Sequence, residues 1–150
     1  MKFSTREDID RPIAEVYAQA SDFALFEKLA AKRGVSVRGE APITSLTEGQ
    51  KWTTGFDYRG RTRQVGAEVV SSDPGQGYAV SFEGEGIVGL GVIDLLALSN
   101  SRTRMFVSLD LRPQSISARV ILQSLKFAKK SLNARFEKRV TAFARMIEGN

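Results

Sequence analysis

The residues able to do chemistry in this 150-residue chain are limited by two absences, since the sequence has no histidine and no cysteine. A Ser-His-Asp triad, a thiolate nucleophile and a His- or Cys-ligated metal are therefore excluded. Acid–base chemistry would fall to Asp, Glu, Lys or Tyr with a shifted pKa, or to Arg as an electrostatic clamp. No convincing catalytic constellation is visible, and the candidates are Tyr58, Tyr78 and Arg63. We expect no metal and no cofactor.

The stretch GEGIVG at 84–89 matches the G-x-G-x-x-G pattern of dinucleotide-binding loops, and Asp110 lies 21 residues further on. Such a site needs a helix that begins at the glycines, within a series of βαβ units. Residues 87–98 instead contain further glycines and a single charged residue, Asp94. The pattern therefore favours a glycine-rich hairpin.

Apolar and polar residues alternate in several runs between residues 51 and 111, separated by turn sequences such as SSDPGQG at 71–77. This period of two predicts antiparallel strands with one buried face. The inward positions predict the wall of a cavity, in which hydroxyl groups orient a guest. The expected ligand-binding residues are Trp52, Thr54, Phe56, Tyr58, Tyr78, Phe82, Met105, Val107, Leu122 and Leu125, with Leu109 and Leu132 as further candidates.

Arg63 has two interpretations. It shares the inward phase of Val65, so it could reach the mouth of the cavity. Alternatively, it lies in solvent near a hairpin tip, beside Arg59 and Arg61.

Two short helices are expected after a first strand at 2–9. Pro12 suits the first turn of a helix and pushes Arg11 toward the extended geometry of an N-cap. Ser21 or Asp22 then caps a second helix, which ends near Gly34. The residues expected to close the cavity from this side are Tyr17, Phe23 and Phe26.

After Pro113 the hydrophobic period returns to 3.6 residues, and a continuous apolar stripe to Ile147 predicts one helix of roughly eight turns. Residues 115–150 carry eight Lys or Arg and two acidic residues, so the net charge of +5 originates there. A solvated basic face is the usual explanation. We do not expect nucleic acid as a partner, because the apolar stripe is committed to the sheet, whereas transient contact with an anionic membrane stays open.

One apolar sheet face and one apolar helical stripe are most simply buried against each other. We therefore expect a single α+β domain over 1–150, in which six or seven curved antiparallel strands wrap around a long C-terminal helix. A twisted sheet around one helix cannot be filled at both ends, so a cavity between sheet and helix is expected.

The stretch IDRPIAEVYAQASDF at 9–23 resembles the pattern of the START/birch-pollen-allergen superfamily: aliphatic-x-x-Pro, then Val-aromatic, then Asp-aromatic. This helix-grip superfamily is also called SRPBCC, or the polyketide cyclase/dehydrase and lipid-transport type. The order of elements extends the resemblance over essentially the whole chain. It implies binding of lipids, sterols, quinones or polyketides, with cyclase or hydrolase activity in some members. No catalytic motif of such an enzyme matches residue by residue.

Three functions are compatible with these patterns. The first is binding or transport of a small hydrophobic ligand in the cavity. The second is a polyketide cyclase or dehydratase, with Tyr58, Tyr78 or Arg63 steering proton transfer or holding an enolate. The third is a protein-interaction module that uses the strand at 87–98 or the basic helix.

Asp94 bears on the third function. If it faces water, Val92 and Leu96 lie outside beside it and form an apolar stripe typical of a dimer surface. A buried, paired Asp94 is the alternative, and both a monomer and a homodimer stay open.

The N-terminal residues MKFSTREDID carry charges where a signal peptide needs an apolar stretch. We therefore expect a cytoplasmic protein.

Overall fold

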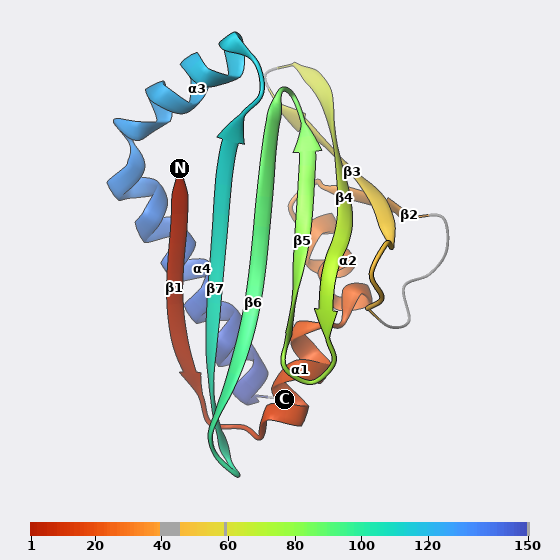
Figure 1. Cartoon of the computed structure of the whole chain (residues 1–150), viewed down its shortest axis with the longest axis vertical. Helices are drawn as coiled ribbons and strands as arrows, with labels where there is room; N and C mark the ends of the chain where they lie inside the picture. Colours follow the sequence, from red (N-terminus) through yellow and green to blue (C-terminus); the bar gives the residue numbers. More distant parts are fainter. Residues whose placement is uncertain (40–45, 59, 150) are drawn as a thin grey trace.

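The computed structural model describes residues 1–39, 46–58 and 60–149; the side chains of Arg38 and Tyr58 are not described. Within these ranges the chain forms seven strands and four helices (Figure 1). Their bounds are β1 (Lys2–Ile9), α1 (Ile13–Ala20), α2 (Phe23–Ala31), β2 (Ser36–Gly39), β3 (Lys51–Tyr58), β4 (Arg61–Asp73), β5 (Gly77–Gly84), β6 (Ile87–Ser99), β7 (Arg102–Pro113), α3 (Ile116–Lys126) and α4 (Lys129–Gly149).

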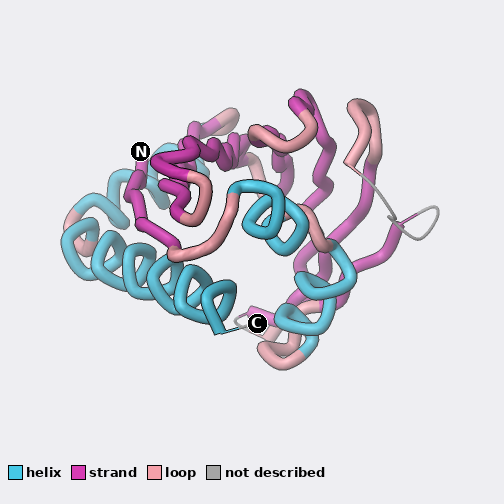
Figure 2. Tube along the Cα trace, turned by 90° about the horizontal axis from the view of Figure 1, so that it is seen from below, coloured by secondary structure: helices cyan, strands magenta, loops and turns pink. Residues whose placement is uncertain are grey.

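The strands of the described residues form one antiparallel sheet in the order β1-β7-β6-β5-β4-β3-β2. Figure 2 shows that this sheet curves around helices α1, α2 and α4, which lie on its concave side. One apolar face of the sheet and the apolar faces of the helices are thereby removed from water together. The predicted α+β helix-grip architecture is confirmed, with seven strands.

Side chains on the concave face come from the alternating positions that the sequence marks as apolar. Trp52 lies opposite Ala67, and Ala67 opposite Phe82. Tyr78 likewise lies opposite Ile93 on the neighbouring strand. Such directly opposed pairs are the main stabilising contacts within a sheet, so the register places a row of large side chains over the concave face.

The hairpin between β5 and β6 contains the GEGIVG stretch. Glu85 has a φ of 55° and Gly86 a φ of 76°, and strand β6 begins at Ile87. A strand therefore follows the glycines where a dinucleotide site requires a helix. The hairpin interpretation of this sequence is correct.

Strand β6 also shows which way Asp94 points. The Asp94 side chain is exposed, whereas Leu95 is buried and Ile93 packs against the core. Leu96 is 52% exposed on the convex face of the sheet. Of the two placements considered for Asp94, the solvent-facing one is found, with Leu96 outside.

The two short helices after β1 are present, with one shift. Pro12 is itself the N-cap of α1, with φ −59° and ψ 149°, so Arg11 lies one residue before the position expected for it. Asp22, rather than Ser21, caps α2, and its side chain accepts a hydrogen bond from the Leu25 amide at 3.2 Å. The chain can therefore end one helix and begin the next within two residues.

A long C-terminal helix is present as predicted, but its expected continuity over eight turns is wrong, because the chain forms α3 and α4, which run in different directions (Figure 1). At the break, the Phe127 amide donates to the Ser124 carbonyl and the Ala128 amide to the Leu125 carbonyl, at 3.3 and 3.0 Å. These bonds span three residues and tighten the turn. The apolar stripe runs through this turn without Gly or Pro, so the period gives no sign of it. Helix α4 is about 32 Å long.

Two hydrophobic clusters fill the concave side. The α4 cluster consists of Ile9, Val16, Leu95, Met105, Val140, Ala144 and Ile147. The α2 cluster consists of Phe23, Leu46, Ala67, Val69, Tyr78 and Val80. Tyr17 and Ile93 pack against both clusters and join them.

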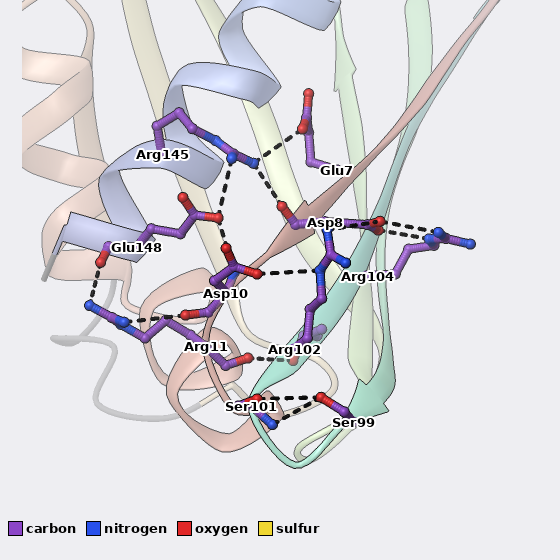
Figure 3. A network of polar contacts seen from close by, with 11 residues as sticks. Glu7, Asp8, Asp10, Arg11, Ser99, Ser101, Arg102, Arg104, Arg145 and Glu148 are labelled. Atoms are coloured by element: carbon purple, nitrogen blue, oxygen red, sulfur yellow. Dashed lines mark hydrogen bonds and ion pairs between the residues drawn. The ribbon is translucent and has the colours of Figure 1, made fainter.

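Polar contacts fasten the C-terminal half of α4 to β1 (Figure 3). Arg145 Nη2 lies 2.7 Å from the Asp8 carbonyl oxygen and 3.3 Å from Glu7 Oε2, and Thr141 donates to Glu7 Oε1. The Asp8 carboxylate accepts two hydrogen bonds from Arg104 on β7, at 2.8 and 3.1 Å. These hydrogen bonds lower the pKa of Asp8 and raise the pKa of Arg104. Side-chain contacts therefore hold the edge strand β1 both to α4 and to its neighbouring strand β7.

Candidate functional site

A cavity of about 380 Å³ lies between the concave face of the sheet and helices α2 and α4, partly open to solvent. Its volume falls within the range of roughly 300–1,000 Å³ that is typical of small-molecule sites. Aromatic rings form much of its wall, from Phe23, Phe26, Trp52, Tyr78, Phe82 and Phe136. Aliphatic side chains fill the spaces between them, from Val35, Val37, Val80, Ile93, Val107 and Leu109.

Phe23 is the centre of the aromatic wall. Its ring centroid lies 5.0 Å from that of Trp52, 5.8 Å from that of Phe26 and 6.3 Å from that of Tyr78. The planes are inclined in each pair, an arrangement that favours contact between the edge of one ring and the face of the next. Phe26 in turn stacks on Phe143 of α4. The rings fix one another, so this side of the wall is formed without a ligand.

Helix α2 supplies its part of the wall from one face. Phe23, Phe26 and Ala30 follow one another after three and four residues, which returns each to the same side of a helix. All three line the cavity, as expected for Phe23 and Phe26. Tyr17, which was expected to close the cavity with them, packs between the two hydrophobic clusters instead.

Glycines on β6 leave room for the cavity. Gly91 lies in the interior of the sheet, where glycine costs stability because it adds no packing and loses more backbone freedom on folding. A Cβ atom at Gly91 would lie 3.2 Å from Cε2 of Phe82, and one at Gly89 would lie 3.1 Å from Cδ2 of Leu111. Gly91 itself lines the cavity. The space beside Phe82 therefore depends on the missing side chain.

The structure brings together half of the residues expected to contact a ligand. Trp52, Thr54, Tyr78, Phe82 and Val107 all line the cavity, from three different strands. Their common feature is the inward phase of the alternating pattern, which the observed register preserves. Contact of these residues with a ligand stays a prediction.

The other expected residues lie elsewhere or are not described. Met105 is fully buried within the α4 cluster. Leu122, a residue of α3, is also buried. Phe56 and Leu125 are partly buried, and neither is part of the cavity wall. Each lies in a strand or helix as expected, but beyond the stretch that faces the cavity. The side chain of Tyr58 lies outside the described residues.

Some of the wall carries no clear signal in the sequence. Val35 and Val37 flank the start of the short strand β2, and a run of four strand residues is too short to show a period. Phe136 belongs to the expected apolar stripe, but the stripe does not show which of its members face a cavity and which face packed side chains. Glu27 lines the cavity margin from α2 and is exposed, as surface carboxylates commonly are.

Tyr78 is buried, and its hydroxyl donates a hydrogen bond to the carbonyl oxygen of Ala20 at the end of α1. Burial, with a smaller effect of Tyr17, raises the pKa of Tyr78 above its usual range. The hydroxyl is therefore neutral at physiological pH, and its proton is already shared with the backbone. This arrangement suits a structural role better than proton transfer.

Arg63 does not line the cavity. Its Nη1 atom lies 3.1 Å from Oε2 of Glu85, and Nη2 of Arg61 lies 3.0 Å from the same oxygen. Neither of the two placements considered is found in full, because Arg63 lies outside the cavity wall but its side chain is only 22% exposed beside Arg61. It is paired there with the turn between β5 and β6.

Two hydroxyl groups of the wall, those of Thr54 and Tyr78, donate to the protein. Thr54 Oγ1 donates to the Val65 carbonyl at 3.1 Å, and Tyr78 donates to Ala20. Each hydroxyl oxygen still has lone pairs that can accept a hydrogen bond. The carboxylate of Glu27 is an acceptor as well. The polar groups named here therefore offer a guest mainly acceptors.

No protein-family model and no curated protein matches the sequence. Solved structures do share its arrangement of elements. The crystal structure of TTHA0849 from Thermus thermophilus is similar with a TM-score of 0.67 at 16% identity, over 98% of this chain and 97% of that chain. Ara h 8.0201 is similar with a TM-score of 0.64 at 14% identity, over 100% of this chain and 99% of that chain.

This chain has the helix-grip fold. The aromatase/cyclase Zhui from Streptomyces sp. R1128 shares it, with a TM-score of 0.64 at 13% identity over 99% of this chain and 92% of that chain. The resemblance to the helix-grip superfamily that the N-terminal stretch suggests is thus confirmed at the level of the fold. Identities this low establish the helix-grip fold alone, because one fold carries many functions.

Proposed function

We propose that this protein binds or transports a small hydrophobic molecule, such as a lipid, a quinone or a polyketide-like compound, in the cavity between sheet and helices. The observation that carries the proposal is the cavity of about 380 Å³ with its wall of aromatic and aliphatic side chains. Gly91 adds support, because the sheet forgoes a stabilising side chain at a position that faces this space.

The polar groups of the wall support a more specific proposal about the ligand. Thr54, Tyr78 and Glu27 offer acceptors, so the polar end of the ligand should be a donor, such as a hydroxyl or an amine. A ligand carboxylate would face the Glu27 carboxylate and lose its hydration without gaining a donor from these groups. Alcohols and amines should therefore bind more tightly than carboxylates with the same hydrophobic part. Glu27→Gln should reduce that preference.

The cyclase or dehydratase alternative rests on Tyr58, Tyr78 or Arg63. The bond from Tyr78 to the Ala20 carbonyl and the pairing of Arg63 with Glu85 favour binding over chemistry for these two residues. The fold shared with Zhui is compatible with either function. If a polyketide-like substrate is turned over, activity that survives Tyr58→Phe, Tyr78→Phe and Arg63→Met would exclude these residues as its source.

Native mass spectrometry of freshly purified protein tests the binding proposal. The protein should carry a hydrophobic adduct, or should take one up from a panel of lipids, quinones and aromatic polyketides. The same compounds should raise its melting temperature by mass action. A protein that takes up none of the panel, and shows no thermal shift with any member, would rule out the proposal for these ligand classes.

Location and assembly stay predictions. Within the described ranges no helix is long and apolar enough to cross a bilayer. A cytoplasmic location is proposed from the sequence, and fractionation of expressing cells tests it. Sedimentation equilibrium distinguishes the monomer from the homodimer that the exposed Leu96 side of β6 would allow.

A further inference from the structure

Helix α3 has apolar residues on two opposite sides. Ala118 and Leu122 are buried against the sheet. Ile116 is 85% exposed, Phe127 is 96% exposed, and Val120 also lies in solvent. At 3.6 residues per turn, these three exposed side chains project within roughly 40° of one another and away from the buried side. Ile116, Val120 and Phe127 therefore form an exposed apolar strip, interrupted by Gln123 and Ser124 before Phe127, which we call the outer strip of α3.

The start of α3 is fixed to the sheet, so the outer strip cannot simply turn inward. The Gln114 amide donates to the Gly86 carbonyl at 2.7 Å, and the Ser115 hydroxyl caps the helix through the Ala118 amide at 3.1 Å. A Cβ atom at Gly86 would lie 3.3 Å from that of Ala118, which shows how closely the helix meets the hairpin. The outer strip is held toward solvent by these contacts.

The charge along the chain segment that carries the outer strip has one sign. From residue 111 to residue 136 the sequence contains no Asp or Glu and six Lys or Arg. Arg119 and Lys126 border the strip along one side of α3, and Lys129 and Lys130 follow the break beside Phe127; all four are exposed. A helix with an exposed apolar strip bordered by basic residues matches the composition of segments that lie at membrane interfaces.

We propose that the outer strip of α3 and the break before α4 dock the protein on an anionic lipid bilayer. Phe127 and Ile116 would enter the boundary between headgroups and acyl chains, while Lys126, Lys129 and Lys130 lie among the anionic headgroups. This inference goes beyond the proposed function and holds whether or not the cavity takes a ligand.

A membrane explains the outer strip better than nucleic acid does. Basic residues alone would serve either partner. Single-stranded nucleic acid, however, is bound by successive stacking rings, and the exposed apolar residues here are aliphatic apart from Phe127. Ile116 and Val120 have no role on a phosphate backbone, but they add to insertion into lipid.

Co-sedimentation with vesicles tests the proposal. The protein should bind phosphatidylcholine vesicles that contain about one-third phosphatidylglycerol, and bind pure phosphatidylcholine at least about tenfold more weakly. The double variants Ile116→Ser/Phe127→Ser and Lys129→Glu/Lys130→Glu should each reduce the partition coefficient about tenfold or more. The controls are Leu96→Ser, on the convex face, and Lys28→Glu, on α2; both should stay within about twofold of the unchanged protein, since neither lies at α3.

A fluorescent label gives a second readout. The chain has no cysteine, so one label can be placed through Ser124→Cys on α3 or through Ser101→Cys in the β6–β7 turn. Helix α3 and the β6–β7 turn lie toward opposite ends of the molecule in Figure 1. The emission of an environment-sensitive dye should shift to the blue with anionic vesicles at residue 124 and not at residue 101.

Several results would overturn the proposal. These are equal binding to both lipid compositions, unchanged binding after Ile116→Ser/Phe127→Ser, and equal loss in the Leu96→Ser control. Binding of duplex DNA without binding of vesicles would assign the surface to nucleic acid instead. Because the altered side chains are exposed, all variants should keep the melting temperature of the unchanged protein. A folded variant that no longer binds vesicles has then lost binding through the altered side chains and not through unfolding.

Discussion

Replacing Gly91 by valine is the sharpest perturbation of the cavity that the fold offers. The new side chain would extend from the interior of the sheet toward Phe82 and into the space now open beside it. Its φ is not in the left-handed region, so a β-branched residue is compatible with the backbone. The variant should therefore fold, and the cavity should become smaller.

The change in stability can be worked from three contributions. Removing glycine from a strand interior stabilises by about 0.5–1 kcal/mol. Burying part of a valine side chain adds about 1 kcal/mol. Moving Phe82 away from its preferred rotamer costs about 0.5–1.5 kcal/mol. The net effect is a gain of about 1 kcal/mol for the unliganded protein, or about 3 °C in melting temperature.

The change in affinity has the opposite sign. The valine side chain displaces roughly three carbon atoms of a ligand, each of which contributes about 0.8 kcal/mol when buried. The loss is about 2.4 kcal/mol, or about 60-fold in the dissociation constant. Emission of the neutral probe phenylnaphthylamine, titrated into each protein, measures this constant, and urea unfolding measures the stability.

Gly66→Val is the matched control, because Gly66 lies on β4 in the outward phase and does not line the cavity. It should show the gain in stability without the loss of affinity. Should Gly91→Val prove too crowded to fold, Gly91→Ala makes the same test with a smaller effect. Equal probe affinity in the unchanged protein and in the Gly91 variants would refute the cavity as the binding site.

Three further predictions concern residues that hold the fold rather than the ligand. Tyr78→Phe should cost about 1–2 kcal/mol in urea unfolding, because the buried Ala20 carbonyl loses its donor, and should leave the affinity for an apolar probe within about threefold. Asp8→Asn should reduce the loss of stability in acid. Arg104 lowers the pKa of Asp8 in the folded protein, so the charged Asp8 stabilises the fold above the unfolded pKa of about 3.9. This stabilisation is lost as the pH falls through the lower pKa of the folded state. A pH series of thermal melts tests this, and an identical acid limb in both proteins would contradict it. Ile147→Ala should destabilise the protein by about 2–5 kcal/mol, since Ile147 is fully buried in the α4 cluster. The folded variant should bind the probe as tightly as the unchanged protein. A loss of affinity equal to that of Gly91→Val would contradict the view that the α4 cluster is distinct from the ligand cavity.

The alternating pattern of the strands was enough to predict the sheet and much of its inner face. Trp52, Thr54 and Phe82 face the cavity because a period of two places every second residue on the same side. Asp22 could also be predicted as a helix cap, because a side-chain acceptor directly before an apolar helical run is a signal contained in adjacent residues. These features depend on near neighbours in the sequence.

Other features depend on contacts that no local pattern encodes. Met105 and Val107 share one phase on β7, yet Met105 is fully buried in the α4 cluster, whereas Val107 is partly buried beside that cluster and also lines the cavity. The break after Lys126 arises from a tightened turn without glycine or proline.

We expect the ligand to occupy the cavity on the concave face. A ¹⁵N–¹H correlation spectrum recorded during titration with the tightest ligand of the panel tests this. A single saturable set of shifts should appear at the Trp52 indole and at the amides of Gly91, Ile93 and Val107. Shifts confined to Ser4, Arg6 and Phe106, which line a smaller hollow of about 250 Å³ on the convex face, would contradict it.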